Sequence, residues 1–199
     1  MQKLTNIFSI FLFGILWTAP SFASEQVTEK VVFYPISGDT AVALYRSIGE
    51  KGPLISDNIR TIAHTNFTLT WQRKYKKDDG NCTLVSAKPR LIITYTLPKP
   101  SQKLPQPVAQ SWQKFITGIE RHEHMHGYFI KDMVRNIELE TVGMSIESDP
   151  KCIKFKAELD KKLSVLFQEQ RQKGRDLDRA DMKSGGIIHQ LLLNFLNGS

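Results

Sequence analysis

Three of the chain's five histidines lie within five positions, at His122, His124 and His126, around Glu123. His122, Glu123 and His126 spell H-E-x-x-H, the short motif of zinc hydrolases. On a helix, His122 and His126 lie one turn apart on the same face, where both rings can bind one metal ion. Glu123 can then accept a proton from a zinc-activated water. The spacing predicts Zn²⁺ bound by His122 and His126, with Glu123 as the catalytic base.

The helix that carries this motif is predicted from apolar residues at three- and four-residue steps between residues 108 and 137. His122 and His126 fall within this stripe, so their rings are expected to point inward, where buried imidazole nitrogens need partners. A metal ion supplies them, and a purely structural histidine pair is the alternative. His124 lies about 200° around the helix from His122 and is expected to face solvent.

A catalytic zinc ion needs a third protein ligand, and the sequence leaves its identity open. The longer pattern H-E-x-x-H-x-x-G-x-x-H is excluded, because its glycine and third histidine would fall at Phe129 and Asp132. A later segment, expected to be a loop, offers Asp178 and Asp181, and the C-terminal region offers His189. We retain Asp181 and His189 as candidates. Three glutamates are further options, although each also fits a surface charge: Glu138, Glu140 and Glu147.

The first half of the chain after residue 30 reads as a small sheet with one short helix. Residues 31–36 predict a strand, and residues 37–53 a helix that begins after Asp39 or Thr40 and stops at Gly52. Alternating apolar residues predict a half-buried strand over 66–75. Two further strands are expected over 82–88 and 90–98, so that neighbouring hairpins form a mostly antiparallel sheet.

The second half is predicted to be helical. A proline-rich connector, residues 98–107, leads into the zinc helix, which is expected to pack on a second amphipathic helix that starts near Cys152 and ends near Gly174. A loop over 174–186 and a short terminal helix follow. The predicted fold class is α+β, with the small sheet first and the two packed helices after it.

The first 23 residues have the features of a secretory signal peptide. A basic start is followed by an apolar run of about a dozen residues, too short to span a bilayer comfortably, and by a small-x-small site before Ser24. Cleavage is expected after Ala23, which leaves a single zinc-peptidase-like domain over residues 24–199 without a stable membrane anchor. The protein is therefore expected to be secreted or periplasmic.

Charge and cysteine content narrow the function classes. The formal net charge is +7, and it falls to +6 without residues 1–23, which contain Lys3 and no acidic residue. The basic residues are scattered, so nucleic acid is not an expected partner. Cys82 and Cys152 are the two cysteines of the chain and belong to no C-x-x-C motif. In an exported protein they predict one disulfide that ties a strand to a helix.

The order of these features resembles a family of bacterial secreted proteins, domain of unknown function 922, described as predicted zinc-dependent proteases. The resemblance runs from about residue 31 to 166 and includes "YPISGDTAVALYRSIGEKGP", "GNCTLVSAKPRLIITYTLP" and "SWQKFITGIERHEHMH". It rests on an ordered series of residues that ends in the His-Glu motif and that includes Trp71, Cys82, Pro98 and Trp112.

The resemblance implies that His122 and His126 bind zinc, that Glu123 is the base and that Cys82 pairs with Cys152. Many members carry Tyr-Asp-x-x-Thr-x-His-Gly near the C-terminus. The nearest stretch here, "RDLDRADMKSGG", keeps aspartates but has no histidine. If that histidine completes the metal site in relatives, this chain either uses another ligand, with Asp181 and His189 as the candidates, or binds metal weakly.

The sequence therefore predicts an exported zinc metallopeptidase that hydrolyses peptide or amide bonds of a peptide or protein substrate in the cell envelope or outside the cell. Two other classes remain open. One is a non-catalytic zinc-binding or interaction protein that retains the H-E-x-x-H helix. The other is a cell-envelope assembly factor in which the histidine pair is structural.

Overall fold

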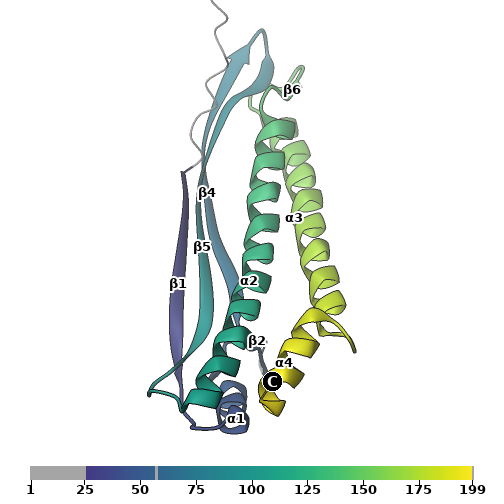
Figure 1. The fold of residues 1–199 in the computed structure, drawn as a ribbon. Helices are drawn as coiled ribbons and strands as arrows, with labels where there is room; N and C mark the ends of the chain where they lie inside the picture. The colour runs from purple at the N-terminus through teal and green to yellow at the C-terminus, as the bar shows by residue number, and fades with distance from the viewer. Residues whose placement is uncertain (1–25, 57, 199) are drawn as a thin grey trace, which may run out of the picture.

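The structure, a computed structural model, describes residues 26–56 and 58–198. The predicted signal peptide, residues 1–23, lies outside the described residues. A four-stranded sheet forms one layer, and two long antiparallel helices, α2 (Gln106–Thr141) and α3 (Ile153–Met182), form a second layer on one of its faces (Figure 1). Two short helices, α1 (Ala41–Lys51) and α4 (Ile187–Asn197), lie at the same end of the molecule. The predicted α+β class is confirmed.

The sheet has the order β1-β5-β4, formed by β1 (Gln26–Ile36), β5 (Asn81–Pro100) and β4 (His64–Asp78). β4 and β5 form a long antiparallel hairpin whose turn contains Asp79 and Gly80, both at positive φ. β1 instead pairs in parallel with β5, so neighbouring hairpins alone do not build the sheet as predicted. The short strand β6 (Ser145–Ile146) extends the far end of β5, and β2 (Leu54–Ser56) pairs with β3 (Ile59–Arg60) separately.

The two strands expected over 82–88 and 90–98 are one continuous strand, β5. Pro89 lies between the two predicted strands, and proline cannot donate a ladder hydrogen bond. Pairing with β1 begins only at Arg90, so at Pro89 the described residues give β5 a neighbour in β4 alone. A proline is tolerated at such an edge-like position.

The helices differ from the prediction mainly in α3. α1 begins after Thr40, whose Oγ1 accepts from the Ala43 N–H at 3.2 Å, and it ends before Gly52, as expected. α2 contains the predicted apolar stripe. α3, however, does not stop at Gly174 but continues to Met182, so most of the predicted loop over 174–186 is helix.

The start of α3 is fixed by Asp149. Its Oδ1 accepts from the Ile153 N–H and its Oδ2 from the Phe155 N–H, both at 2.8 Å. Burial raises the pKa of Asp149, but these N–H donors outweigh burial and hold the pKa below its ordinary value. Asp149 thereby satisfies N–H groups at the helix start, where the N-cap side chain of Cys152 makes no such bond.

A glycine lets α2 approach the sheet closely beside the histidine motif. A Cβ atom on Gly127 would lie 2.1 Å from the Oη of Tyr95, on β5. Tyr95 is buried and its hydroxyl donates to Glu29 of β1 at 2.6 Å. Any larger residue at position 127, next to His126, would therefore displace either the Tyr95 side chain or α2 itself.

The disulfide between Cys82 and Cys152 joins β5 to the start of α3 at the end of the molecule opposite α4. Cys82 is fully buried, and the bridge lies in an apolar cluster with Leu84, Phe155 and Leu159. Because it connects the sheet layer to the helix layer, it holds the end of the molecule at which α2 leads into α3.

Removing this disulfide should lower the free energy of unfolding by about 4 kcal/mol, because it closes a loop with a sequence separation of 70 residues. Chemical denaturation of the wild-type protein with and without reductant, beside Cys82→Ala/Cys152→Ala, measures this loss. The double variant, which has no disulfide to reduce, should not respond to reductant. Equal midpoints for oxidised and reduced wild-type protein would contradict the prediction.

Candidate metal centre

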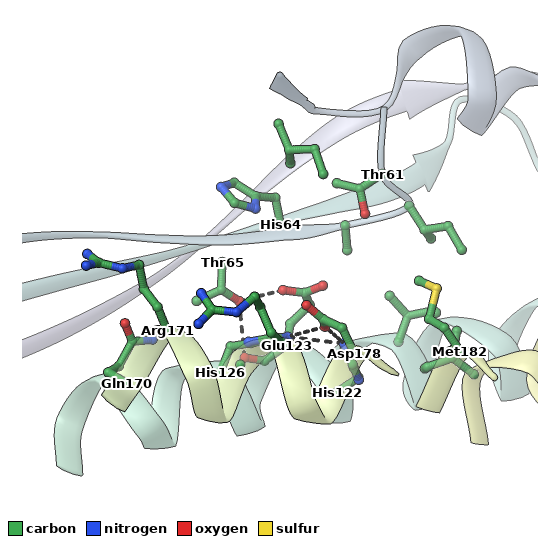
Figure 2. A pocket seen from close by; sticks show the side chains of 17 residues that line it. Thr61, His64, Thr65, His122, Glu123, His126, Gln170, Arg171, Asp178 and Met182 are labelled. Carbon is green, nitrogen blue, oxygen red and sulfur yellow. Dashed lines mark hydrogen bonds and ion pairs between the residues drawn. The ribbon is translucent and has the colours of Figure 1, made fainter. Parts of the chain in front are cut away.

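Helices α2 and α3 bring three potential metal ligands together. His122 Nε2 lies 3.2 Å from His126 Nε2, and Asp178 Oδ1 lies 3.1 Å from the first nitrogen and 2.9 Å from the second. Within the described parts of the chain, these three residues form the group of histidine, cysteine and acidic side chains able to hold a metal ion. The two histidines of α2 and the aspartate of α3 thus meet at one point (Figure 2).

Asp181 determines which nitrogen of His122 faces this point. Its Oδ2 lies 2.8 Å from His122 Nδ1, and a carboxylate oxygen accepts, so Nδ1 carries the proton. In the neutral ring, Nε2 then presents a lone pair toward His126 Nε2 and Asp178 Oδ1. Electron-pair donors that face one another in this way repel unless a cation or an added proton lies between them. A carboxylate on the outer nitrogen of a ligating histidine is the usual support of such a metal ligand.

The spacing of the three atoms is compatible with a bound metal ion such as zinc. Tetrahedral zinc with ligand distances of about 2.0–2.1 Å places neighbouring ligand atoms roughly 3.3 Å apart. The three separations here are 2.9, 3.1 and 3.2 Å. Asp178 is half-exposed, at 51%, so the site is open on the side of that residue. Three protein ligands with an open position are typical of catalytic rather than structural zinc sites.

The carboxylates in contact with the group favour a cation. Burial lowers the pKa of His122, but the carboxylates of Asp178 and Asp181 outweigh burial and raise the pKa above its ordinary value. Burial raises the pKa of Asp178, whereas its contacts with His122 and His126 hold the pKa well below its usual range. Two carboxylates therefore surround the imidazole pair, and a divalent cation would be attracted to the same position.

Glu123 is buried and its carboxylate is oriented by the sheet. Thr65, near the start of β4, lies with its Oγ1 2.6 Å from Glu123 Oε2 and 3.1 Å from the Glu123 carbonyl oxygen. The hydroxyl has one proton, and the shorter contact makes the carboxylate its acceptor. Among the described residues, no hydrogen bond engages Oε1, which leaves this oxygen available to a ligand.

A cavity of about 660 Å³ opens over these residues. Its walls come from the segment that leads into β4, from α2 and from α3, and His122, Glu123, His126 and Asp178 all line it. Figure 2 shows these four side chains between the strand that carries Thr65 and the two helices. A ligand in the cavity can therefore reach the metal group and Glu123 together.

The other histidine of the motif and the terminal one lie elsewhere. His124 is 47% exposed, packs on the ring of Tyr95 at 4.4 Å and has its Nδ1 3.8 Å from Glu29 Oε2. It faces away from the metal group, as predicted. His189, retained as a third-ligand candidate, accepts from the Gly185 N–H at 3.3 Å and does not join the group.

The glutamates proposed as third ligands also lie outside the group. Glu138 is 16 residues beyond His122 on the same helix, which places it about 24 Å away along the axis. Glu140 pairs with Lys162 of α3 at 3.0 Å. Asp178 is the third potential metal ligand, whose identity the sequence left open. Asp181 instead contacts the other ring nitrogen of His122, Nδ1.

The sequence did not predict that Asp178 lies on a helix beside the histidines or that Thr65 contacts Glu123. Asp178 was assigned to a loop because Gly174 read as a helix end, although the helical period of the preceding apolar residues continues to positions 178 and 181. A Cβ on Gly174 would lie 3.3 Å from His126 Nδ1, so this glycine serves close packing between the two helices. Thr65 shares the alternation of Phe67 and Leu69, which indicated a core-facing side chain.

Residues 31–186 match a family of bacterial proteins of unknown function, DUF922. The chain belongs to the DUF922 family. The matched range ends at Gly186, so it contains the H-E-x-x-H helix and the whole of α3, including Asp178. No curated protein and no solved structure matches the chain. The description of this family gives no function.

Loss of Asp178 should weaken zinc binding more than loss of Asp181. Removal of a supporting partner typically costs about 10–100-fold in metal affinity, and removal of a ligand should cost more. We expect Asp178→Ala to lose more than Asp181→Asn, with competition against a chelating dye as the measurement. Asp176→Asn, on the same helix but paired with Arg179, is the matched control and should bind like the wild type. Wild-type affinity in Asp178→Ala would exclude it as a ligand.

Zinc affinity should fall as pH falls, with an onset set by His122. Zinc binds the neutral imidazole, so a proton competes with it, and the raised pKa of His122 starts this competition at higher pH than for an ordinary histidine. We expect a progressive loss of affinity as pH falls, which begins at a higher pH than the protonation of an ordinary histidine, whose pKa is about 6.5. Asp181→Asn removes one stabilising carboxylate and should shift the onset to lower pH. An identical pH profile in this variant would contradict the role of Asp181.

Proposed function

We propose that this protein is a zinc-dependent hydrolase of peptide or amide bonds. The observation that carries the proposal is the arrangement of Glu123: its carboxylate lies in the same cavity as the His122–His126–Asp178 group and is held by Thr65 rather than by a ligand contact. A base that is adjacent to a metal site, but is not part of it, is the arrangement that hydrolysis by activated water requires.

A zinc ion bound by the three residues would polarise the scissile carbonyl and make water acidic enough to lose a proton near neutral pH. Glu123 would accept that proton at Oε1, since Thr65 engages Oε2. The protonated carboxyl would then donate it to the nitrogen of the leaving amine, so that Glu123 returns to its starting state. Thr65 prevents rotation of the carboxylate during both transfers.

The substrate is proposed to be a peptide or protein outside the cytoplasm. The Cys82–Cys152 disulfide supports this location, since such bonds persist mainly in oxidising compartments. No helix in the described ranges, 26–56 and 58–198, has the length and apolarity to cross a membrane. The predicted signal peptide would direct the chain to the periplasm or out of the cell.

Glu123→Gln should retain zinc but lose turnover by about 10²–10⁴-fold, because the amide cannot accept the proton of water. Cleavage of a fluorogenic peptide library by zinc-loaded protein, with zinc content measured by mass spectrometry, tests both parts. Glu120→Gln is the matched control, since Glu120 is a glutamate of the same helix whose side chain is 47% exposed and does not line the cavity.

His126→Ala should lose both zinc and turnover. A wild-type protein that holds one zinc ion per chain, but whose turnover is unaffected by Glu123→Gln, would favour the non-catalytic zinc-binding alternative. Absence of bound zinc from the wild type would leave a structural histidine pair instead.

A further inference from the structure

The cavity over the metal group has two chemically different ends. At one end, α3 contributes Gln170, Arg171 and Arg175. At the other end, α2, α3 and α4 contribute Ile119, Met182 and Ile188. Figure 2 shows Gln170 and Arg171 on one side of the metal group and Met182 on the other.

Helix geometry explains why the metal group lies between these ends. Arg171, Arg175, Asp178 and Met182 follow one another at steps of four, three and four, so they share one face of α3. At 1.5 Å per residue, Arg175 lies about 4.5 Å and Arg171 about 10 Å from Asp178 along the axis, with Met182 about 6 Å in the opposite direction. Ile119, one turn before His122 on antiparallel α2, lies at the Met182 end.

The two arginines at the cationic end have no acidic partner in the described residues. Arg175 donates to the amide oxygen of Gln172, and neither guanidinium forms an ion pair. The acidic residues that line the cavity are Glu123 and Asp178, and both are engaged, one by Thr65 and the other by the histidines. Two guanidinium groups beside a site for a divalent cation repel it, and a bound anion would relieve this repulsion.

We propose that Arg171 and Arg175 select substrates that carry a carboxylate on one side of the scissile bond, while the Met182 end receives an apolar side chain on the other. Guanidinium groups bind carboxylates through paired N–H donors, which gives both attraction and orientation. The substrate class is thus a peptide with an acidic residue and an apolar residue around the cleaved bond. This inference rests on the proposed function, because the metal group marks the position of that bond.

Phosphinic pseudopeptides, in which a phosphinate replaces the scissile amide, test the inference by binding and without turnover. One pair has Glu or Gln on the N-terminal side of the phosphinate and Leu on the other, and a second pair has the reverse order. We expect the Glu form of one pair to bind zinc-loaded wild-type protein about tenfold more tightly than its Gln form at low ionic strength. Arg171→Gln/Arg175→Gln should reduce this ratio to nearly one.

Two controls separate local recognition from general charge. Arg179→Gln/Lys161→Gln also removes two positive charges, but from exposed positions of α3 where each pairs with a nearby acid. This variant should keep the preference for the Glu form. Met182→Ala should weaken both members of a pair equally and leave their ratio unchanged. Zinc affinity and the thermal unfolding midpoint of each variant establish that the fold and the metal group are intact.

The outcomes distinguish this inference from the proposed function. Zinc-dependent binding of the probes without a Glu preference in either order would overturn the arginine inference and leave the hydrolase proposal standing. A preference that survives in Arg171→Gln/Arg175→Gln, or that is lost equally in the α3 control, would also overturn it. Failure of every probe to bind zinc-loaded wild-type protein, or failure of the protein to bind zinc, would overturn the proposed function and the inference together.

Discussion

The structure depends on three electron-pair donors that face one another where α2 meets α3. Two imidazole nitrogens and one carboxylate oxygen within 3.2 Å are stable together only when a cation or a proton lies among them. Asp181 strengthens this constraint because it fixes the tautomer of His122 and turns a lone pair toward the group. The arrangement can accordingly hold a metal ion.

The rest of the molecule keeps the two helices in the register that this contact requires. The disulfide at one end ties the start of α3 to β5, and Asp149 caps that start through two backbone N–H groups. Close contacts at two glycines, Gly127 against Tyr95 and Gly174 against His126, set how near α2 lies to the sheet and to α3. At the other end, Phe195 of α4 stacks on Phe115 of α2 at 4.7 Å.

The sheet contributes to the site as well as to the core. Its edge strand β4 begins beside the cavity, and Thr65 on that strand orients Glu123 while Phe67 and Leu69, on the same face, pack into the central core. One strand thus joins the apolar interior to the base of the proposed reaction. This explains how a small mixed sheet with one helical layer can hold a carboxylate in a defined orientation near a metal group.

The sequence by itself determined the local features. The period of apolar residues predicted α2, the two histidines at four-residue spacing predicted a shared face, and the cysteines in a chain with a signal-like start predicted a disulfide. The exposure of His124 also followed from its angle around the helix. The disulfide follows from the presence of two cysteines in such a chain, and each of the other conclusions depends on spacing within one element, which a linear pattern contains.

The tertiary structure alone decided which distant residues complete the site. Gly174 is unfavourable within a helix by about 1 kcal/mol and reads as an end, yet packing against His126 carries α3 past it and brings Asp178 to the histidines. The parallel pairing of β1 with β5 was similarly hidden, because register between distant strands is set by the whole core. A third ligand and an orienting threonine come from other elements, and only the packing of those elements shows that they meet.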